Sequence, residues 1–414
     1  MKKLFFIAAI AGAALVSCTK NELAPSATEQ HEITFASPVA STVTKTPLIP
    51  SDYPTTESFS VYADYHKDEY ALTNADDFTS YMRGSEGVAV THKTSPILNN
   101  SFNSYWSAAT KYYWPMDGHL TFAAYSPTEV NGFAEISYDI VNGVQITGFE
   151  INTKTQYDLM LSDRTVNQKK GDMGIDKGRN PANDADNDGV SDLEYDGVMI
   201  KFNHVLSAIK FGVQTAADYK TTDGYTITLQ SLTVKNAYSK GNLKQFVNKD
   251  ATTVELSKVW SNVGTPNEKG YTITNTPVEL NTTIKTFTDP AHADWVMLPQ
   301  VLDHGDNDVE VEITYSVSHK DMGVKEENGQ PVYNNGQPVY NSITYTKSLS
   351  LAGTGTTADG SDEGDDPDAI TVNSWLAGNR YIYTIIIGME EIVFAPTVVA
   401  PWTDVNVNVP ESSI

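Results

Sequence analysis

A short acidic segment carries a pattern of side chains that suits a metal ion. Within residues 184–195, oxygen-bearing side chains stand at the first, third, fifth and ninth positions, and Gly189 stands at the sixth. Calcium loops use this spacing, and their seventh position supplies a backbone carbonyl oxygen. The twelfth position, where a bidentate glutamate is expected, is Tyr195. We therefore predict either an aspartate-rich calcium loop or a plain acidic turn, and the candidate Ca2+ ligands are Asp184, Asp186, Asp188, Val190 and Asp192.

The only cysteine, Cys18, stands directly after a short apolar run. Lys2 and Lys3 precede the uncharged residues 4–16, which is the plan of a secretory signal and is too short for a membrane-spanning helix of about 20 residues. Residues 15–18, Leu-Val-Ser-Cys, look like a lipobox, in which the cysteine thiol takes a lipid. We predict that residues 1–17 are removed and that Cys18 is lipidated, because two acyl chains hold a protein stably on a membrane. The alternative is an ordinary signal peptide with a chance cysteine.

Familiar catalytic patterns are missing from the sequence. It has no His-Glu-x-x-His, no Gly-x-Ser-x-Gly and no phosphate-binding glycine loop, and its 8 histidines are scattered. We therefore predict that the chain is not an enzyme, although a triad assembled from distant residues stays open. The formal charge of −24 argues against nucleic acid as a partner, because phosphate backbones attract basic surfaces. The lipid is then the expected contact with a membrane.

The elements that must position these residues are predicted to be β-strands. Apolar and polar residues alternate over residues 58–65, 118–125, 225–230 and 309–318. Residues 381–387 are apolar on both faces, as in a central strand. No long stretch shows helical periodicity. Short strands separated by turn residues predict an all-β chain made of β-sandwiches.

Three polar segments interrupt the strands and set the predicted organisation. Residues 167–197 are rich in Gly, Asp and Asn and mark a domain boundary. The sequence Asn-Gly-Gln-Pro-Val-Tyr at 328–333 recurs at 335–340, and because Asn-Gly favours tight turns it predicts an elaborated hairpin loop. Residues 353–368 predict a mobile surface loop. We predict a signal peptide at 1–17, a tether at 18–30, and β-sandwich domains at 31–197 and 198–414.

Several segments together resemble the fimbrillin family, the subunits of type V pili. The strongest is residues 375–385, Trp-Leu-Ala-Gly-Asn-Arg-Tyr-Ile-Tyr-Thr-Ile, followed by Ile392, Phe394, Pro396 and Trp402. The other matching segments, in chain order, are residues 113–115, 122–127, 157–160, 202–209 and 298–300. The resemblance implies two tandem transthyretin-like β-sandwiches and a lipoprotein precursor carried to the outer membrane and cell surface. It also implies assembly by strand exchange, after a trypsin-like protease removes the N-terminal strand.

The resemblance gives a role to residues 31–43, the first strand candidate. Ile33 and Phe35, with Val39, are its apolar residues, and this is the strand that processing would remove. The family's processing site is a basic residue, commonly arginine. This chain has lysine instead, so the resemblance puts the cut between Lys45 and Thr46, and a solvated loop lysine is the alternative.

An alternating segment near residue 407 suits the opposite role, that of a donor strand. An open sheet edge binds an extended segment through main-chain hydrogen bonds, while alternate side chains fill pockets. The candidate donor residues are Val405, Val407 and Val409, which could also close the chain's own sheet. We therefore predict a structural subunit of a cell-surface pilus that supports adhesion, with other pilus subunits and a processing protease as partners.

The competing prediction is a surface lipoprotein that binds glycan and does not polymerise. Its binding platform would be a cluster of aromatic residues, although aromatic strand residues more often pack in a core. The cluster comprises Tyr105, Trp106, Tyr112, Tyr113 and Trp114. His204 follows a strand-like run beside apolar residues, so we expect a core histidine hydrogen-bonded to the backbone rather than a ligand.

Overall fold

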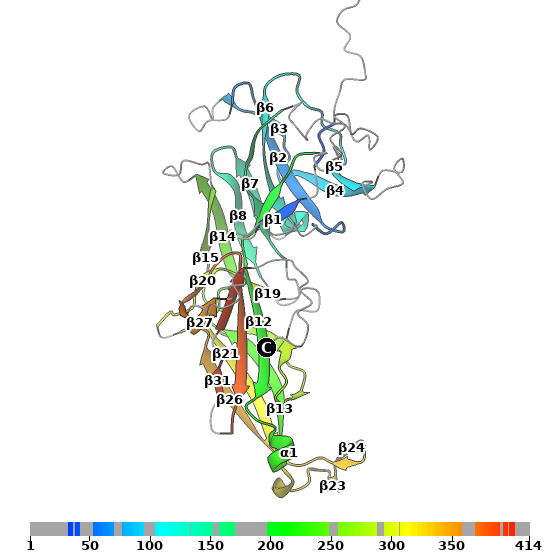
Figure 1. Cartoon of the computed structure of the whole chain (residues 1–414), viewed down its shortest axis with the longest axis vertical. Coiled ribbons are helices and arrows are strands. Elements are labelled where there is room, and N and C mark those ends of the chain that lie inside the picture. Colours follow the sequence, from blue (N-terminus) through cyan, green and yellow to red (C-terminus); the bar gives the residue numbers. More distant parts are fainter. Residues whose placement is uncertain are drawn as a thin grey trace, which may run out of the picture.

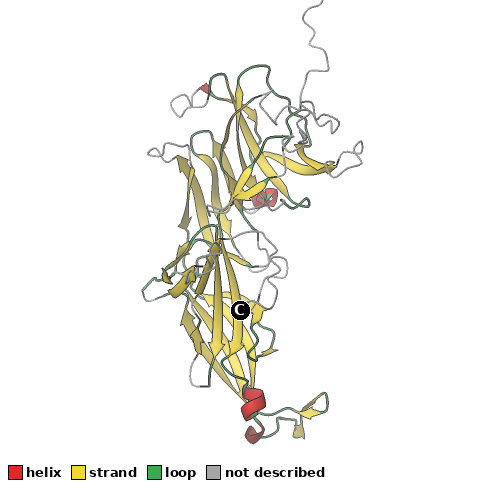
Figure 2. Ribbon diagram, in the orientation of Figure 1, coloured by secondary structure: helices red, strands yellow, loops and turns green. Residues whose placement is uncertain are grey.

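The chain is almost entirely β-structure, as predicted (Figure 2). Among the residues described, helix comprises α1 (Tyr219–Asp223), the 3-10 turns η2 (Thr128–Gly132) and η4 (Lys320–Met322), and Asp77. No helix among these residues has the length and apolar character to span a membrane. The computed structural model describes residues 32–35, 38–41, 53–69, 77–94, 104–132, 134–151, 157–169, 197–247, 256–287, 294–305, 307–357, 369–389, 392–395 and 397–401.

A nine-stranded sheet forms the upper end of the elongated molecule in Figure 1. Seven strands follow the order β1–β11–β9–β6–β2–β4–β5, while β10 pairs with β6 and β3 pairs with β2. The strands are β1 (Val39–Ser41), β2 (Ser58–His66), β3 (Thr79–Met82), β4 (Val88–Thr94), β5 (Ser104–Ala108), β6 (His119–Ser126), β9 (Met160–Ser162), β10 (Thr165–Gln168) and β11 (Lys201–His204).

A four-stranded sheet lies below it, in the order β15–β14–β8–β7. Its strands are β7 (Glu135–Asp139), β8 (Gly143–Glu150), β14 (Lys240–Val247) and β15 (Leu256–Asn262). β14 runs antiparallel to β8, with Leu243 opposite Ile146. This sheet therefore joins strands from both sides of residue 197 in the sequence.

Two larger sheets build the lower half of the molecule. The eight-stranded sheet has the order β18–β12–β30–β32–β27–β28, with β19 on β12 and β31 on β30. Its strands are β12 (Ser207–Thr215), β18 (Lys285–Phe287), β19 (Trp295–Met297), β27 (Gly353–Thr357), β28 (Ala369–Val372), β30 (Asn379–Ile387), β31 (Ile392–Phe394) and β32 (Thr397–Pro401).

The five-stranded sheet has the order β16–β13–β21–β26, with β17 on β13. Its strands are β13 (Thr226–Lys235), β16 (Tyr271–Thr274), β17 (Val278–Glu279), β21 (Glu310–Ser318) and β26 (Ser342–Ser350). A small separate pair joins β20 (Gln300–Val301) to β29 (Ser374–Trp375). The antiparallel ladder between β21 and β26 runs from Glu310 opposite Ser350 to Ser318 opposite Ser342.

An arm, residues 323–341, connects β21 to β26 at the lower end of the molecule (Figure 1). It holds two hairpins, β22 (Glu326–Glu327) with β23 (Gln330–Pro331) and β24 (Tyr333–Asn334) with β25 (Gln337–Pro338). Asn328 and Asn335 have φ angles of 54° and 48°, and each precedes a glycine with positive φ. Two successive positive φ angles are what a tight hairpin turn requires. The repeated sequence therefore forms the elaborated loop that was predicted.

Three equivalent residues of the arm, seven positions apart, close a ring of backbone hydrogen bonds. The amide of Val332 donates to the carbonyl of Lys325 (2.9 Å), and the amide of Val339 donates to that of Val332 (2.9 Å). The amide of Lys325 then donates to the carbonyl of Val339 (2.7 Å). The arm thus holds its shape through its own backbone.

Three clusters of buried side chains form the cores. The upper cluster includes Phe59 and Phe202, and the lower cluster includes Trp375 and Tyr383 between the two larger sheets. The middle cluster includes Leu243, together with residues from both sides of residue 197 in the sequence. Alternate residues of each strand point inward because the side-chain period of a strand is two. Burying one such aromatic or aliphatic side chain contributes about 1.5–3 kcal/mol.

The predicted strands are confirmed as β2, β6, β13 and β21, and β30 lies between β12 and β32 as a central strand should. The predicted alternation holds in the burial of β13 and β21, but it is wrong for β2 and β6, which are buried on both faces. The prediction of a loop over residues 353–368 is wrong for 353–357, which form β27. Glycine serves close packing there, because a Cβ at Gly355 would lie 2.6 Å from the carbonyl oxygen of Thr397 in the neighbouring strand β32. Residues 358–368 lie outside the described residues, and the two-domain division stays a prediction.

Candidate functional site

The described part of the N-terminal segment, residues 32–35 and 38–41, is hydrogen-bonded into the upper sheet from both sides. On one side the amide of Phe35 donates to the carbonyl of Trp106 (2.9 Å), and the amide of Trp106 donates back (3.2 Å). On the other side the amide of Val198 donates to the carbonyl of Thr34 (2.8 Å), and β1 runs parallel to β11. β5 and the β1–β11 pair are opposite ends of the strand order. The N-terminal segment therefore closes the sheet on itself.

The side chains of this segment fill the upper core. Phe35 has 0% of its surface exposed, and its ring packs edge-on against Phe59 and Phe122 with centroids 5.7 and 5.8 Å apart. Ile33 is also buried, and its amide donates to the carbonyl of Tyr112 (2.7 Å). Removal of the segment would leave an apolar groove between two strand edges without their partners.

Tyr53 forms part of the same core. Its ring stacks on Phe202 at 5.8 Å, and its hydroxyl lies 2.5 Å from the hydroxyl of Ser126. Burial raises the pKa of Tyr53 well above its ordinary value, so the phenol stays protonated. The groove left by the N-terminal segment would keep this aromatic wall.

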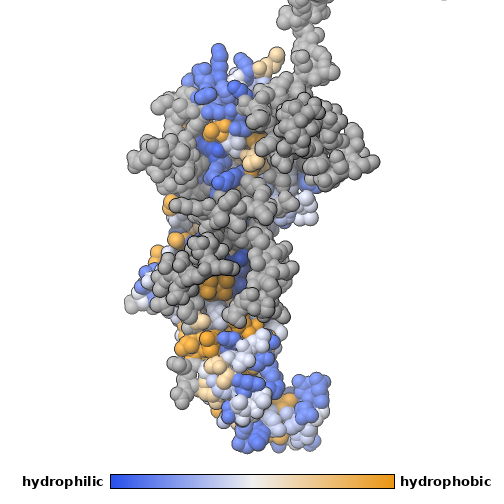
Figure 3. Space-filling model, viewed as in Figure 1, coloured by the Kyte–Doolittle hydropathy of each residue, from blue (hydrophilic) through white to orange (hydrophobic). Residues whose placement is uncertain are grey.

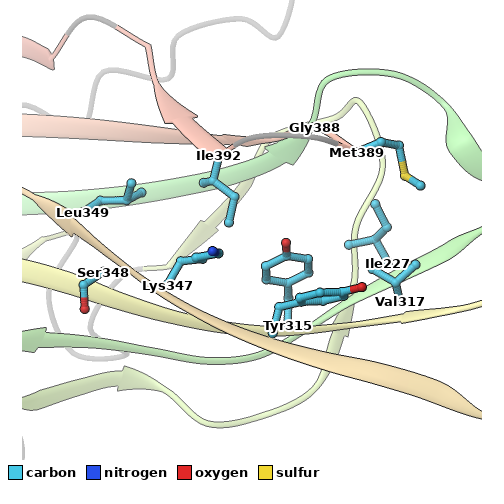
Figure 4. A pocket seen from close by; sticks show the side chains of 10 residues that line it. Ile227, Tyr315, Val317, Lys347, Ser348, Leu349, Gly388, Met389 and Ile392 are labelled. Atoms are coloured by element: carbon cyan, nitrogen blue, oxygen red, sulfur yellow. The ribbon is translucent and has the colours of Figure 1, made fainter.

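An opening lies in the lower half, between β26 and β31 (Figure 4). We call it the β26–β31 groove. It has a volume of about 400 Å³ and is lined by Ile227, Tyr315, Val317, Tyr345, Lys347, Ser348, Leu349, Gly388, Met389 and Ile392. Tyr315 and Tyr345 stack with centroids 5.4 Å apart, and burial, followed by the neighbouring Tyr345, raises the pKa of Tyr315. Most of the lining side chains are apolar or aromatic, but the groove exposes as much polar as apolar surface.

The buried carboxylate of Asp64 belongs to a closed ion-pair network. Its two oxygens accept from Arg83 Nη2 (2.5 Å) and from the hydroxyl of Tyr138 (2.8 Å). The guanidinium of Arg83 also lies over the Tyr138 ring, 4.9 Å from its centroid. Burial raises the pKa of Asp64, while the bond from Tyr138 and the charge of Arg83 oppose that rise. These contacts tie β2 and β3 to β7, which is a structural role.

Most site residues predicted from the sequence lie outside the described residues. Among the described residues, no group of three His, Cys, Asp or Glu side chains is placed to hold a metal ion. The predictions that remain untested concern the lipid site Cys18, the processing site Lys45 and Thr46, the calcium ligands Asp184, Asp186, Asp188, Val190 and Asp192, and the donor residues Val405, Val407 and Val409.

The aromatic cluster considered for sugar binding is largely packed. Trp106 and Trp114 are 2% and 6% exposed, so both belong to the upper core, and Tyr112 packs against it. His204 is buried as expected, and its Nδ1 lies 2.9 Å from the side-chain atom Asp158 Oδ1. The pairing of β11 with β9 brings these two residues together, and nothing in their sequence positions indicates it.

A comparison with models of protein families identifies the chain. The model described as fimbrillin-like matches residues 55–402. The chain belongs to the fimbrillin-like family. The family is one of structural fimbrial proteins, in agreement with the predictions of a pilus protein at the cell surface and of no enzymatic activity. The resemblance found in the sequence is confirmed.

Solved structures similar to this fimbrillin-like chain include two fimbrial proteins. One is a fimbrial protein from Bacteroides vulgatus ATCC 8482, with 15% identity, a TM-score of 0.44, and coverage of 90% of this chain and 100% of that chain. Another is a fimbrilin (fimA) from Porphyromonas gingivalis W83, with 11% identity, a TM-score of 0.36, and coverage of 91% and 99%. No curated protein matches the chain.

Proposed function

We propose that this fimbrillin-like chain is a pilus subunit that assembles by donor-strand exchange and supports adhesion. The observation that carries the proposal is the position of Phe35, fully buried and hydrogen-bonded to Trp106 in a segment that precedes Lys45. A cut after Lys45 would let the segment leave and would open a groove with two free edges. Free strand edges bind extended segments of other chains.

The proposed donor is the segment that contains Val405, Val407 and Val409 of a neighbouring subunit. Its apolar side chains recur every second residue, so one face of an extended strand would enter the upper core in place of Ile33 and Phe35. Asn406 and Asn408 would remain on the opposite face.

Cys18 is proposed to tether the precursor to the outer membrane through its lipid. A cut after Lys45 would then separate the folded subunit from that lipid. Mass spectrometry of the surface-displayed protein tests this directly: a mature N-terminus at Thr46 supports a transient tether, and an N-terminus at a lipidated Cys18 would show a permanent anchor instead.

Limited trypsin treatment tests strand exchange. Protein lacking residues 1–17 and carrying Cys18→Ser is treated with trypsin, and high-mass ladders are sought on an unheated denaturing gel. We expect ladders from this protein and monomer from the Lys45→Gln variant, because that variant keeps its N-terminal segment. Ladders of equal strength from Lys45→Gln would show that cleavage at this lysine is not needed.

Deletion of residues 403–414 tests the donor. The truncated protein should be cut as before and stay folded by circular dichroism, but it should give no ladders. Normal ladders from it would rule out this segment as the donor. A stable monomer that binds polysaccharide would favour the glycan-binding lipoprotein instead. The calcium prediction is tested separately by calorimetry at millimolar calcium.

A further inference from the structure

The arm, residues 323–341, projects from the lower end of the molecule near α1 (Figure 1). Its residues are exposed or half-buried, and a Cβ atom added at Gly329 or Gly336 would meet no other atom within 4 Å. None of the arm residues belongs to the three core clusters. A segment with this much exposed surface and no part in a core is available for contacts with another molecule.

The two hairpins of the arm have the same backbone pairing but different side chains. Glu326 lies opposite Pro331 in the first hairpin, and Tyr333, seven positions later in the sequence, lies opposite Pro338 in the second. The second hairpin, residues 333–338, contains no charged residue, whereas the first, residues 326–331, contains two glutamates. One hairpin therefore presents an aromatic ring where the other presents a negative charge.

The backbone of the arm is organised before any ligand binds. The hydrogen bonds among Lys325, Val332 and Val339 close a ring that fixes both hairpins. At the base of the arm, the amide of Asn341 donates to the carbonyl of Gly323 (2.9 Å). A loop that already has its bound conformation loses less conformational entropy on binding, and this favours affinity.

The exposed side chains of the second hairpin suit a sugar. Tyr333 is 62% exposed, and a tyrosine ring packs against the C–H groups of a sugar ring while its hydroxyl group stays available for a hydrogen bond. Asn335 stands in the exposed turn two residues later. Its amide group offers a donor and an acceptor side by side, as two neighbouring sugar hydroxyl groups require. Tyrosine, asparagine and glycine are also the residues that dominate the binding loops of antibodies.

Charge and size favour a neutral sugar as the ligand of the arm. Glu326 and Glu327 are exposed in the adjacent hairpin, and the whole chain carries a formal charge of −24. Like charges repel an acidic sugar, so it is disfavoured. The arm is small for a protein interface, which takes about 20–30 residues on each side. Figure 3 shows mainly hydrophilic surface at this end of the molecule.

We propose that the arm is a binding site for neutral glycans, in which Tyr333 stacks on a sugar ring and Asn335 hydrogen-bonds to sugar hydroxyl groups. The site deepens the adhesive part of the proposed function and rests on it. A single shallow site of this kind binds weakly, and its repetition along a fibre raises the overall affinity because many sites engage one surface together. The arm takes no part in strand exchange, so the single subunit also binds the glycan.

The experiment uses the full chain after signal removal, biotinylated at its only cysteine, Cys18, and displayed in several copies on fluorescent streptavidin. The probe is a printed array of neutral oligosaccharides that end in galactose, mannose or fucose, and of acidic ones that end in sialic acid or sulfate. We expect binding to neutral members of the array. Tyr333→Ala should weaken it about tenfold or more, and Tyr333→Phe should keep it, because the ring supplies the contact.

The first hairpin offers matched controls for each variant. Asn335→Gly removes the amide group but suits the positive φ of this position, and it should also weaken binding. Glu326→Ala and Asn328→Gly make comparable changes at the equivalent positions of the first hairpin and should not weaken it.

Amide exchange at Val332 and Val339 separates loss of binding from loss of structure, and it should be the same in Tyr333→Ala as in the unmodified protein. Glycan binding that Tyr333→Ala and Asn335→Gly both retain would overturn the arm as the site and leave adhesion through another surface. A preference for the acidic members of the array would overturn the neutral class.

Two further outcomes would also overturn the proposal. One is binding to gastric mucin that survives periodate oxidation, which destroys sugar rings with neighbouring hydroxyl groups, because it would indicate a protein partner. The other is absence of binding to every sugar on the array. Trypsin treatment of Tyr333→Ala should still give high-mass ladders, so failure of glycan binding and failure of strand exchange are distinguished.

Discussion

Phe35 occupies the upper core although it lies near the N-terminal side of the first described strand. Its ring contacts Phe59 and Phe122, and its backbone is bonded to Trp106. We predict that Phe35→Ala lowers the free energy of unfolding by about 3–5 kcal/mol, because it leaves a cavity among aromatic rings. Urea unfolding of the uncleaved protein measures this change.

Met116→Ala is the matched control for Phe35→Ala, because Met116 is 93% exposed. It should change the free energy of unfolding by less than about 0.5 kcal/mol. If Phe35→Ala were equally mild, the N-terminal segment would contribute little to the upper core, and its release would not create a groove that favours a new strand.

Asp64 makes the stability of the protein depend on pH. Burial raises its pKa above the ordinary value of 3.8, so between these two values the folded state binds more protons than the unfolded state. The Asp64 contribution to the free energy of unfolding therefore falls as pH rises through this window. We predict that Asp64→Asn removes this fall. The quantity to compare is the free energy of unfolding at pH 7 minus the free energy of unfolding at pH 4, and it should be more positive in the variant than in the unmodified protein.

Tyr138→Phe should shift the same difference in the opposite direction. The variant loses the hydrogen bond that lowers the pKa of Asp64, so the raised pKa moves further up and the fall with pH grows. Urea unfolding at the two pH values measures both variants. Equal pH differences in all three proteins would mean that Asp64 titrates alike in the folded and unfolded chains.

The arm is an element whose backbone conformation depends on particular residues. Gly336 has a φ of 78°, so Gly336→Val introduces a β-branched residue where L-residues pay about 1–2 kcal/mol. We predict that amide exchange at Val332 and Val339 becomes about 5–30-fold faster. The global free energy of unfolding should fall by the same amount, about 1–2 kcal/mol, and no more, because the strain acts on the folded arm and the arm lies outside the three cores.

Gly353→Val is the control for the arm, because Gly353 has no positive φ and open space around its Cα. It should leave exchange at Val332 and Val339 unchanged. Slow exchange in Gly336→Val would show that the ring of backbone hydrogen bonds tolerates a strained turn.

The sequence predicted strands and turns correctly where a few neighbouring residues determine the conformation. β21 alternates inward Val311, Ile313 and Tyr315 with polar residues, and the two Asn-Gly pairs of the arm turn as predicted. The glycine at position 355 led to the wrong prediction of a loop. A glycine that forms a turn and a glycine that packs under a neighbouring strand cannot be told apart in the sequence. The close approach of Thr397 exists only once β27 and β32 are side by side.

The candidate site could be predicted only in part. The first strand candidate, residues 31–43, included Ile33 and Phe35, and both are buried, although the described strand β1 covers only Val39–Ser41. Their partners Trp106 and Val198 lie about 70 and 160 positions away, and period-two patterns contain no information about which strand is adjacent. The β26–β31 groove could not be predicted from the sequence either, because it depends on which strands become neighbours in the folded sheets.

At the scale of the whole molecule, charge governs how copies approach each other. The formal charge of −24 makes subunits repel, and this repulsion is screened over about 30 Å at 0.01 M salt and about 8 Å at 0.15 M. We predict that trypsin-treated protein assembles faster at 0.15 M than at 0.01 M sodium chloride, as followed by light scattering. The rate of cleavage is measured at both salt concentrations as a control, and slower assembly at high salt would indicate that attractive charges steer the contact.

The sheet of β7, β8, β14 and β15 bears on how the molecule responds to tension. Its strands run close to the long axis in Figure 1, and β14 hydrogen-bonds to β8 across the middle of the molecule. A pull on the two ends would load these bonds together in shear rather than one after another. The unfolding rate governs rupture under force, so this shared sheet sets how long a subunit survives in a stretched fibre.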